Sequence, residues 1–359
     1  MNILYTNFHR GSGGGHDTYI TSLIARSPHS VFVACPPTSS LYRTLEQQRF
    51  SNLFPLSFPG KLKELPAVIR NVRALSRLID GYEIDIVHTN GSPDNRLVLY
   101  ARMLCTRKFR TVLTKHNSFP VSGRVSRWRF LRANDAVILV SHSVTQTLGF
   151  PVSAPGVHVI RNGVDTRWWQ PPDETDAPVS DRLRLVSIAG TAPYKGWHYL
   201  LRALALLPPA VRARFSVTIA GHTPPDERLR RLCGGLPVEV TFTGFLSDPR
   251  PLLAKSDIGF VLSDAVETIS FACREMMAAG LPVIVSDFGG LPENITAGTD
   301  GWIVPAGDER ALAALLTCIS RMHARDIAEM KRSARRKAVE EFDISQMVGA
   351  TNQVYASLT

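Results

Sequence analysis

The stretch of sequence that decides the fold runs from residue 258 to residue 286 and reads IGFVLSDAVETISFACREMMAAGLPVIVS. Two short apolar runs, Ile258–Leu262 and Pro282–Ser286, enclose a segment with helical spacing at Phe271–Ala279. Short apolar runs on either side of a helix are typical of buried strands in a parallel sheet. The stretch therefore predicts one strand–helix–strand unit of an α/β protein.

The same alternation extends in both directions from this unit. The other expected strands are Asn2–Phe8, Val31–Cys35, Ile84–His88, Thr111–Thr114, Val137–Val140, Leu183–Ile188, Phe215–Ala220 and Val238–Thr243, and the other expected helices are Thr18–Ala25, Pro66–Ile79 and Trp197–Leu207. Proline and glycine cluster between Pro151 and Pro178, which is typical of a linker. The pattern predicts two Rossmann-like domains, residues 1–170 and 171–340. Ligands of such sheets bind at the carboxyl ends of the strands, so we expect the site in a cleft between the domains.

Composition places the chain among ordinary globular proteins. Its 359 residues are 44% hydrophobic and 20% charged, and no apolar run approaches the ~20 residues of a membrane helix. The first residues lack the basic and apolar regions of a secretion signal. Five scattered cysteines without a CxxC pair exclude a zinc ribbon and favour a reducing compartment. We therefore expect a soluble, cytoplasmic protein.

The charge is strongly basic and unevenly distributed. The net charge is +10, which favours anionic partners. No acid lies between Asn95 and Asn134, a segment that holds Arg96, Arg102, Arg107, Lys108, Arg110, Lys115, Arg124, Arg127, Arg129 and Arg132. We expect Arg102–Arg132, with Trp128 among its arginines, to bind an anionic acceptor or the head groups of a membrane surface. A second basic cluster, at 321–337, is interpreted as a solvated helix face, and no RNP, KH or helix-turn-helix pattern suggests nucleic acid.

Three local motifs are suited to a ligand with phosphates and hydroxyls. Gly11–His16 follows the first strand, where glycines let the backbone approach a ligand and a helix N-terminus favours an anion. Gly190–Gly196 opens the second half and carries Lys195, a point charge suited to phosphate. Glu267 and Glu275 lie eight residues apart, ~12 Å if helical. Two surface glutamates on a helix are the alternative interpretation of that last pair.

Glu267–Glu275 followed by MMAAGLPVI resembles the E-x7-E signature of the family-four retaining glycosyltransferases of the GT-B fold (glycosyl transferases group 1). Further motifs resemble this family in the same order along nearly the whole chain. They are Gly13–Gly15, Thr114–His116, Val140–Ser141, Ile160–Asp165, Gly190–Gly196, Phe242–Phe245, Phe288–Glu293 and Gly301–Pro305.

The resemblance implies transfer of a sugar, with retention, from a nucleotide-diphosphate-sugar to a hydroxyl of a glycan or lipid-linked glycan, in polysaccharide or lipopolysaccharide assembly. It implies that Lys195 contacts the diphosphate, that Glu275 binds the ribose, and that Glu267 binds the donor sugar. His116 would lie beside the anomeric carbon, and His116 and Glu267 are the expected catalytic residues. The implied donor-binding residues are Gly14, Gly15, Gly190, Lys195, Ile269, Ser270, Phe271 and Glu275, and the expected acceptor-side residues are His16, Arg124 and Arg127.

No metal or other cofactor is expected, and the sequence has no Asp-x-Asp pair to hold a metal. The resemblance also suggests that residues 341–359 form a helix that packs back on the first domain, and that the protein attaches peripherally to the inner face of the plasma membrane.

Two departures from the family pattern leave the donor open. Many relatives have an arginine where this chain has Thr191, so one counter-charge of the diphosphate is missing or comes from elsewhere. Many have Gly-Phe-Gly where this chain has Thr268-Ile269-Ser270, whose side chains either add donors or reshape the sugar pocket. A nucleotide-sugar 2-epimerase and a non-catalytic protein that binds sugar nucleotides or anionic glycans are the alternative functions.

Overall fold

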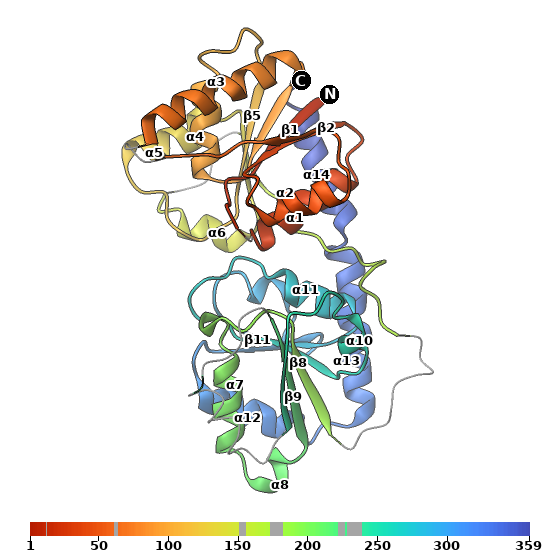
Figure 1. The fold of residues 1–359 in the computed structure, drawn as a ribbon. Coiled ribbons are helices and arrows are strands. Elements are labelled where there is room, and N and C mark those ends of the chain that lie inside the picture. Colours follow the sequence, from red (N-terminus) through yellow and green to blue (C-terminus); the bar gives the residue numbers. More distant parts are fainter. Residues whose placement is uncertain (12, 61–63, 151–155, 173–181, 222–226, 228–238) are drawn as a thin grey trace. The chain divides into compact units, whose positions relative to one another are not determined.

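The computed structural model describes residues 1–11, 13–60, 64–150, 156–172, 182–221, 227 and 239–359 (Figure 1). Its contacts divide the chain into two compact units, Met1–Arg161 with Met347–Thr359, and Asn162–Gln346. The first boundary lies earlier than the expected residue 170. The reason is that Val164 bonds within the second unit: its N–H donates to Phe342 O at 2.8 Å, and its O accepts from Ile344 N at 2.9 Å.

The first unit is built on a seven-stranded parallel sheet of order β3-β2-β1-β4-β5-β6-β7. Its strands are β1 Asn2–Thr6, β2 Ser30–Cys35, β3 Leu53–Pro55, β4 Ile86–Thr89, β5 Arg110–Lys115, β6 Ala136–Leu139 and β7 Val157–Val159. Its helices are α1 Gly15–Ala25, α2 Ser40–Gln47, α3 Leu65–Gly81, α4 Ser92–Ala101, α5 Arg124–Trp128, a π-helical turn Arg129–Ala133, and α6 His142–Thr147. The parallel order is that of an open Rossmann-like sheet.

The second unit repeats the plan with six parallel strands in the order β10-β9-β8-β11-β12-β13. The strands are β8 Leu183–Ser187, β9 Phe215–Ala220, β10 Glu239–Gly244, β11 Ile258–Val261, β12 Val283–Ser286 and β13 Gly301–Val304. The helices are α7 Trp197–Leu206, α8 Pro209–Arg212, α10 Arg250–Ala254, α11 Phe271–Ala278, α12 Glu309–Ile319 and α13 Ala324–Glu341. Single 3-10 turns lie at Pro193–Lys195 and Pro292–Asn294. Two parallel α/β sheets confirm the predicted fold class.

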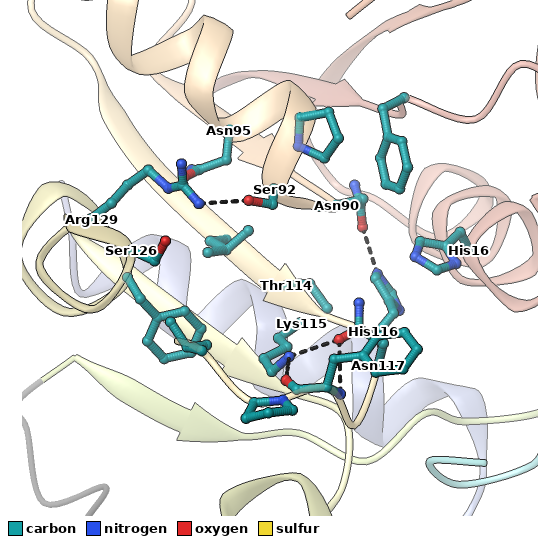
Figure 2. Close-up of a pocket in the computed structure, with 18 of the residues that line it drawn as sticks. His16, Asn90, Ser92, Asn95, Thr114, Lys115, His116, Asn117, Ser126 and Arg129 are labelled. Atoms are coloured by element: carbon teal, nitrogen blue, oxygen red, sulfur yellow. Dashed lines mark hydrogen bonds between the residues drawn. The ribbon is translucent and has the colours of Figure 1, made fainter. Parts of the chain in front are cut away.

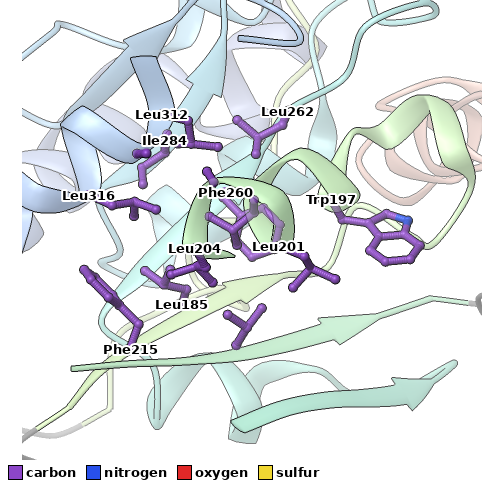
Figure 3. Packing of buried hydrophobic residues seen from close by; sticks show 14 of the residues in the cluster. Leu185, Trp197, Leu201, Leu204, Phe215, Phe260, Leu262, Ile284, Leu312 and Leu316 are labelled. Carbon is purple, nitrogen blue, oxygen red and sulfur yellow. The ribbon is translucent and has the colours of Figure 1, made fainter. Parts of the chain in front are cut away.

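Apolar layers on both faces of the second sheet hold its strand ends in place. Figure 3 shows one layer, in which Leu185, Phe215 and Phe260 of the strands pack against α7 and α12. The other layer packs Val186 and Val261 against α11 and α13. Side chains alternate between the faces of a strand, so adjacent residues such as Leu185 and Val186 serve opposite layers. Burial on both faces explains why these strands are apolar throughout.

The C-terminal helix, α14 (Ile344–Ala356), contains the second boundary between the units. Its Tyr355 hydroxyl lies 2.5 Å from His88 Nδ1 of β4 and 3.1 Å from the Tyr5 hydroxyl of β1. All three side chains are buried. The last residues therefore belong to the first unit. Among the described residues, no helix combines the length and apolar character that crossing a bilayer requires.

Candidate functional site

The loop that follows β8 brings Lys195 to the carboxyl end of the second sheet. The loop turns at Gly196, whose φ of 70° is favourable for glycine. A Cβ at Gly196 would lie only 1.8 Å from Leu262 O, just beyond β11. The loop can therefore approach β11 closely only because residue 196 has no side chain.

Lys195 forms an ion pair with Glu267 at this end of the sheet. Lys195 Nζ lies 2.9 Å from Glu267 Oε2, and Ser263 Oγ donates to the same oxygen at 3.2 Å. The other oxygen, Oε1, accepts from the N–H groups of Thr268 at 3.3 Å and Ser270 at 3.2 Å. Glu267 is 8% exposed, so its buried charge is balanced by Lys195 and by three neutral donors. An ammonium has three protons, so Lys195 can bind Glu267 and a phosphate together.

Ser270 shapes the start of α11. Its side chain accepts from Cys273 N at 3.3 Å and caps the helix, while its own N–H bonds to Glu267. Its φ is +54°, a region that glycine tolerates far better than serine. The two neighbours of Ser270 are also expected to bind phosphate. The Ile269 side chain is buried, with 1% of its surface exposed. Phe271 is the first residue of α11, where backbone N–H groups lack an intrahelical acceptor.

Gly289 supports Glu267 from the loop after β12. Its φ is +59°, and a Cβ there would lie 2.2 Å from Glu267 O. The loops after β8, β11 and β12 thus meet at Glu267, the first two through its carboxylate and the third against its backbone carbonyl. Parallel strands place these three loops at the same edge of the sheet, where ligands of such folds bind.

Arg274 and Asn294 are functional neighbours that the sequence analysis missed. Arg274 lies between the two glutamates, is fully buried, donates through Nε to Asn294 Oδ1 at 2.7 Å, and lies over the Phe342 ring at 4.1 Å. Asn294 Nδ2 in turn donates to Ile269 O at 2.9 Å. This chain of contacts holds the loop before α11. The available signal was an arginine among the apolar neighbours Cys273, Met276 and Met277.

Glu275 lies in the second turn of α11 and is partly buried. Burial disfavours its charged form and raises its pKa to about 7. Carboxyl groups with a strongly raised pKa are common in binding and catalytic sites, so the pKa of Glu275 agrees with a place in such a site.

Thr191 occupies the position of the family's arginine and carries no charge. It is 4% exposed, and its carbonyl accepts from Trp197 Nε1 at 3.0 Å. Its buried hydroxyl has no hydrogen-bond partner among the described residues. Gly190 precedes it with a φ of 95°. Lys195 is therefore the basic side chain that this loop contributes.

In the first unit, Asp17 organises the glycine loop before α1. Asp17 accepts from Gly13 N at 3.0 Å and from Asn7 Nδ2 at 2.8 Å. Gly14 precedes α1, and Gly15 is its first residue. Asp17 thereby ties the loop to the end of β1.

Three histidines gather next to this loop. The His16 and His116 rings lie 4.2 Å apart between centroids, and the His9 and His16 rings 4.5 Å apart. Burial lowers the pKa of His16 to about 4, with a further contribution from His9. Burial and the neighbouring histidines lower the pKa of His116 well below its ordinary value. These imidazoles are therefore neutral at pH 7.

Asn90 sets the tautomer of His116 (Figure 2). Its Nδ2 donates to Thr6 O at 3.0 Å, which turns Oδ1 toward His116 Nε2 at 2.9 Å. His116 therefore carries its proton on Nε2, and Nδ1 is the acceptor nitrogen. The Asn90 N–H donates to buried Asp94 at 2.7 Å, so α4 holds Asn90 in place. Sequence analysis missed Asn90, which carries no motif.

A cavity of about 290 Å³ opens beside His16 and His116. Other polar residues that line the cavity include Asn90, Ser92 and Arg129. Arg129 Nη2 donates a hydrogen bond to Ser92 Oγ at 2.6 Å (Figure 2). Lys115 donates to Asn117 Oδ1 at 2.8 Å and to Phe119 O at 2.7 Å, which fixes the histidine loop.

The two arginines expected on the acceptor side do not line this cavity. Arg124 is exposed on α5. Arg127 donates to Val121 O and Gly149 O at 3.3 Å each and lies over the Phe150 ring. Arg129, two residues later, is the arginine in the cavity. Ser126, Arg129 and Phe130 line the cavity at helical spacing, so Arg124 and Arg127 lie on other faces of the same segment.

Part of the acid-free basic stretch is neutralised by acids from outside it. Arg107 pairs with Asp85 at 2.7 Å, and Asp135 pairs with Arg110 at 3.0 Å and Arg102 at 3.4 Å. The positive field is therefore smaller than the sequence alone indicates.

Ser270→Ala should lower the free energy of unfolding by about 1 kcal/mol, because alanine keeps the unfavourable φ and removes the cap. The free energy of unfolding of Ser270→Gly should stay within about 0.5 kcal/mol of the wild-type value. Glycine also loses the cap, but it adopts the positive φ without strain. Urea unfolding followed by circular dichroism measures both. Equal losses in the two variants would contradict the role of φ.

Glu275→Gln should stabilise the protein above pH 7 by about 1–3 kcal/mol, because the wild-type carboxyl must ionise at a partly buried position. Glu275 ionises near pH 4.5 in the unfolded chain but stays protonated until about pH 7 in the folded protein. The free energy of unfolding of the wild type therefore decreases as the pH rises from 4.5 to 7, and the two proteins are equally stable at pH 4.5. Unfolding at several pH values measures this. Glu329→Gln, on exposed α13 surface, is the control, and parallel wild-type and Glu275→Gln profiles would refute the prediction.

Comparisons with known proteins agree with this architecture. The family model for glycosyltransferase family 4 matches residues 13–168. The amylovoran biosynthesis glycosyltransferase AmsK of Erwinia amylovora is 30% identical over 53% of this chain and 48% of its own length. The lipopolysaccharide core biosynthesis mannosyltransferase LpsB of Rhizobium meliloti is 27% identical over 84% of this chain and 87% of its own. For the curated relatives that share 30–33% identity with it, the chain spans about half of the relative's length.

A solved structure has the same fold. Anabaena Alr3699/HepE in complex with UDP-glucose superposes with a TM-score of 0.81 at 22% identity, over 99% of this chain and 100% of that one. The family model for glycosyl transferases group 1 matches residues 182–321, which include the Lys195–Glu267 pair. Because the two family models match residues 13–168 and 182–321, the chain belongs to the group 1 glycosyltransferases, and its two parallel sheets form the GT-B fold.

Proposed function

We propose that the protein transfers a sugar from a nucleotide-diphosphate-sugar to a hydroxyl of a glycan or lipid-linked glycan, with retention of the anomeric configuration. The observation that carries the proposal is the buried Lys195–Glu267 pair beside the start of α11, within the region that matches the family model. AmsK and LpsB, by name, act in the biosynthesis of a polysaccharide and of the lipopolysaccharide core, which supports a similar glycan acceptor. The UDP-glucose complex of HepE supports a nucleotide-sugar donor.

On the donor side, negative charge builds on the diphosphate as the bond from sugar to phosphate breaks. Lys195 and the N–H groups in the first turn of α11 would stabilise that charge, as preorganised donors do in other transferases. Glu267, held by four donors, would orient hydroxyls of the sugar, and Glu275 would bind those of the ribose. Lys195, the amides and the helix N-terminus supply the positive charge, so the proposal needs no metal ion.

On the acceptor side, His116 would contact the reacting groups as a neutral imidazole. Its low pKa keeps it uncharged at pH 7, and Asn90 holds it as the Nε2–H tautomer. His16, also neutral, lies beside it in the same cavity. Arg129 adds a positive charge to the cavity, which suits an acceptor that carries phosphate or carboxylate.

We propose a peripheral position at the inner face of the plasma membrane. Val125 and Trp128 of α5 are 77% and 61% exposed, and the exposed Arg124 and Arg132 lie near them in sequence. Exposed apolar side chains interleaved with arginines are typical of segments that lie at an anionic lipid surface.

The proposal is tested with a panel of uridine, guanosine and adenosine diphosphate sugars. We expect release of the nucleotide only when a glycan extract is present, a product that keeps the donor's anomeric configuration by NMR, and equal rates with and without EDTA. An isomerised donor without acceptor would favour the epimerase, and binding without turnover would favour the non-catalytic protein.

Two variants separate the roles of the two units in that assay. Glu275→Ala should weaken nucleotide-sugar binding about tenfold or more, because it removes a charge-assisted hydrogen bond to the ribose. His116→Ala should lower turnover and leave donor affinity unchanged. Unchanged donor affinity in Glu275→Ala would contradict the ribose assignment.

Vesicle flotation tests the peripheral position. The wild type should bind vesicles with anionic lipid and not neutral ones, and Trp128→Ala should lower the bound fraction severalfold. Leu206→Ala, at an exposed leucine of the second unit, is the matched control. Equal binding to neutral and anionic vesicles at low salt would overturn the idea.

A further inference from the structure

A second cavity lies within the second unit, at the opposite end of the sheet from Lys195 and Glu267. It has a volume of about 660 Å³. Leu183, the first residue of β8, lines it, as do Asp257 just before β11 and Leu281 just before β12. Because these strands are parallel, their amino ends lie about 16 Å, one five-residue strand, from the edge that carries the donor site. The cavity is therefore separate from the site described above.

Positive charge dominates the lining of this amino-end cavity. Its basic side chains are Arg182, Arg184, Lys331, Arg332, Arg335 and Arg336, and Asp257 is the one acid among its described lining residues. Among the described lining residues, basic side chains therefore outnumber acidic ones. Four of the six belong to the basic cluster of α13 that sequence analysis interpreted as a solvated face.

Asp257 balances only part of this charge. Arg184 binds it through Nε at 2.8 Å and through Nη2 at 3.0 Å, and Lys331 Nζ lies 3.1 Å from it. Arg335 Nη1 donates to three backbone carbonyls, which hold its position without neutralising it. Two cations therefore share one carboxylate, and a third is bound only by neutral acceptors.

The side chains of Arg332 and Arg336 form no hydrogen bond or ion pair with any residue in the described part of the chain. Both are exposed at the cavity, one helical turn apart on α13. Like charges at this spacing destabilise a helix. A bound anion would remove the repulsion and use both guanidinium groups, which are well suited to phosphate and carboxylate.

The cavity wall is apolar where it is not basic. Leu183, Leu253, Leu281 and Ile327 contribute to it, with small side chains at Ala254, Ala279 and Ala328. Its volume matches that of pockets for drug-sized ligands, so an inorganic anion would leave most of it unfilled. We infer that this cavity binds an anionic amphiphile, a molecule that joins a phosphate or carboxylate group to an apolar chain.

Calorimetry with dodecyl phosphate, below its aggregation concentration, tests this on the full chain. Wild type should bind it, and Arg332→Glu/Arg336→Glu should bind about tenfold or more weakly, since two charge-assisted contacts are lost. Ala328→Trp, which keeps every charge and fills the cavity, should also weaken binding. Arg321→Glu/Arg325→Glu makes the same charge change at exposed arginines outside the cavity and should leave affinity within about twofold of wild type.

Equal affinities in wild type and Arg332→Glu/Arg336→Glu would overturn the inference, as would equal binding of the uncharged dodecyl maltoside. Inorganic phosphate should bind far more weakly than dodecyl phosphate, and equal binding would refute the apolar part of the site. Flotation on phosphatidylcholine vesicles with and without phosphatidic acid, with Trp128→Ala present in every protein so that the α5 contribution is reduced, identifies the source. A loss of vesicle binding in the Arg332→Glu/Arg336→Glu variant supports a membrane lipid, and retained vesicle binding with lost dodecyl phosphate binding supports a soluble ligand.

Discussion

The ion pair between Lys195 and Glu267 is the interaction on which the rest of the second unit's site depends. It joins the loops after β8 and β11, and Gly289 brings the loop after β12 against the same residue. A buried carboxylate is stable only when it is paired and hydrogen-bonded, and removing its partner costs about 3–5 kcal/mol. The bonds from Thr268 and Ser270 to Glu267 then fix the start of α11. One charge pair therefore positions the three loops and a helix N-terminus.

The first unit organises its site by a different principle. Its central side chains, His16 and His116, are uncharged because they are partly buried beside one another, which lowers the pKa of each. Hydrogen bonds with directional amides, rather than charge, determine their orientation, and Asn90 is the main example. A neutral imidazole with a fixed tautomer can contact a sugar or its acceptor without attracting a competing anion. The proposed transferase thus places an ion pair at the diphosphate in one unit, and neutral histidines with a nearby arginine at the acceptor in the other.

The helix α13 shows how one element serves both stability and recognition. Ala334 and Ala338 pack against the apolar layer that includes α11, which needs small side chains for close approach. The side chains of Arg332 and Arg336 line the amino-end cavity. A parallel sheet has two ends, and the loops of the carboxyl end supply the donor site. Arg332 and Arg336 lie at the other end, away from those loops, and this is why we infer a second ligand there.

The sequence by itself determined the α/β class, most strands and the motifs around Glu267 and His116, because apolar runs and glycine loops are local signals. It missed β3, β7 and β13, which are three or four residues long and lie at the edges of their sheets. Only the tertiary structure decided that Glu267 pairs with Lys195, that Asn90 orients His116, and that Arg129 rather than Arg127 lines the cavity. These contacts join residues that are distant in the chain, or depend on which face of a short helix is turned to the cavity. Their energies come from burial and geometry, which no local pattern encodes.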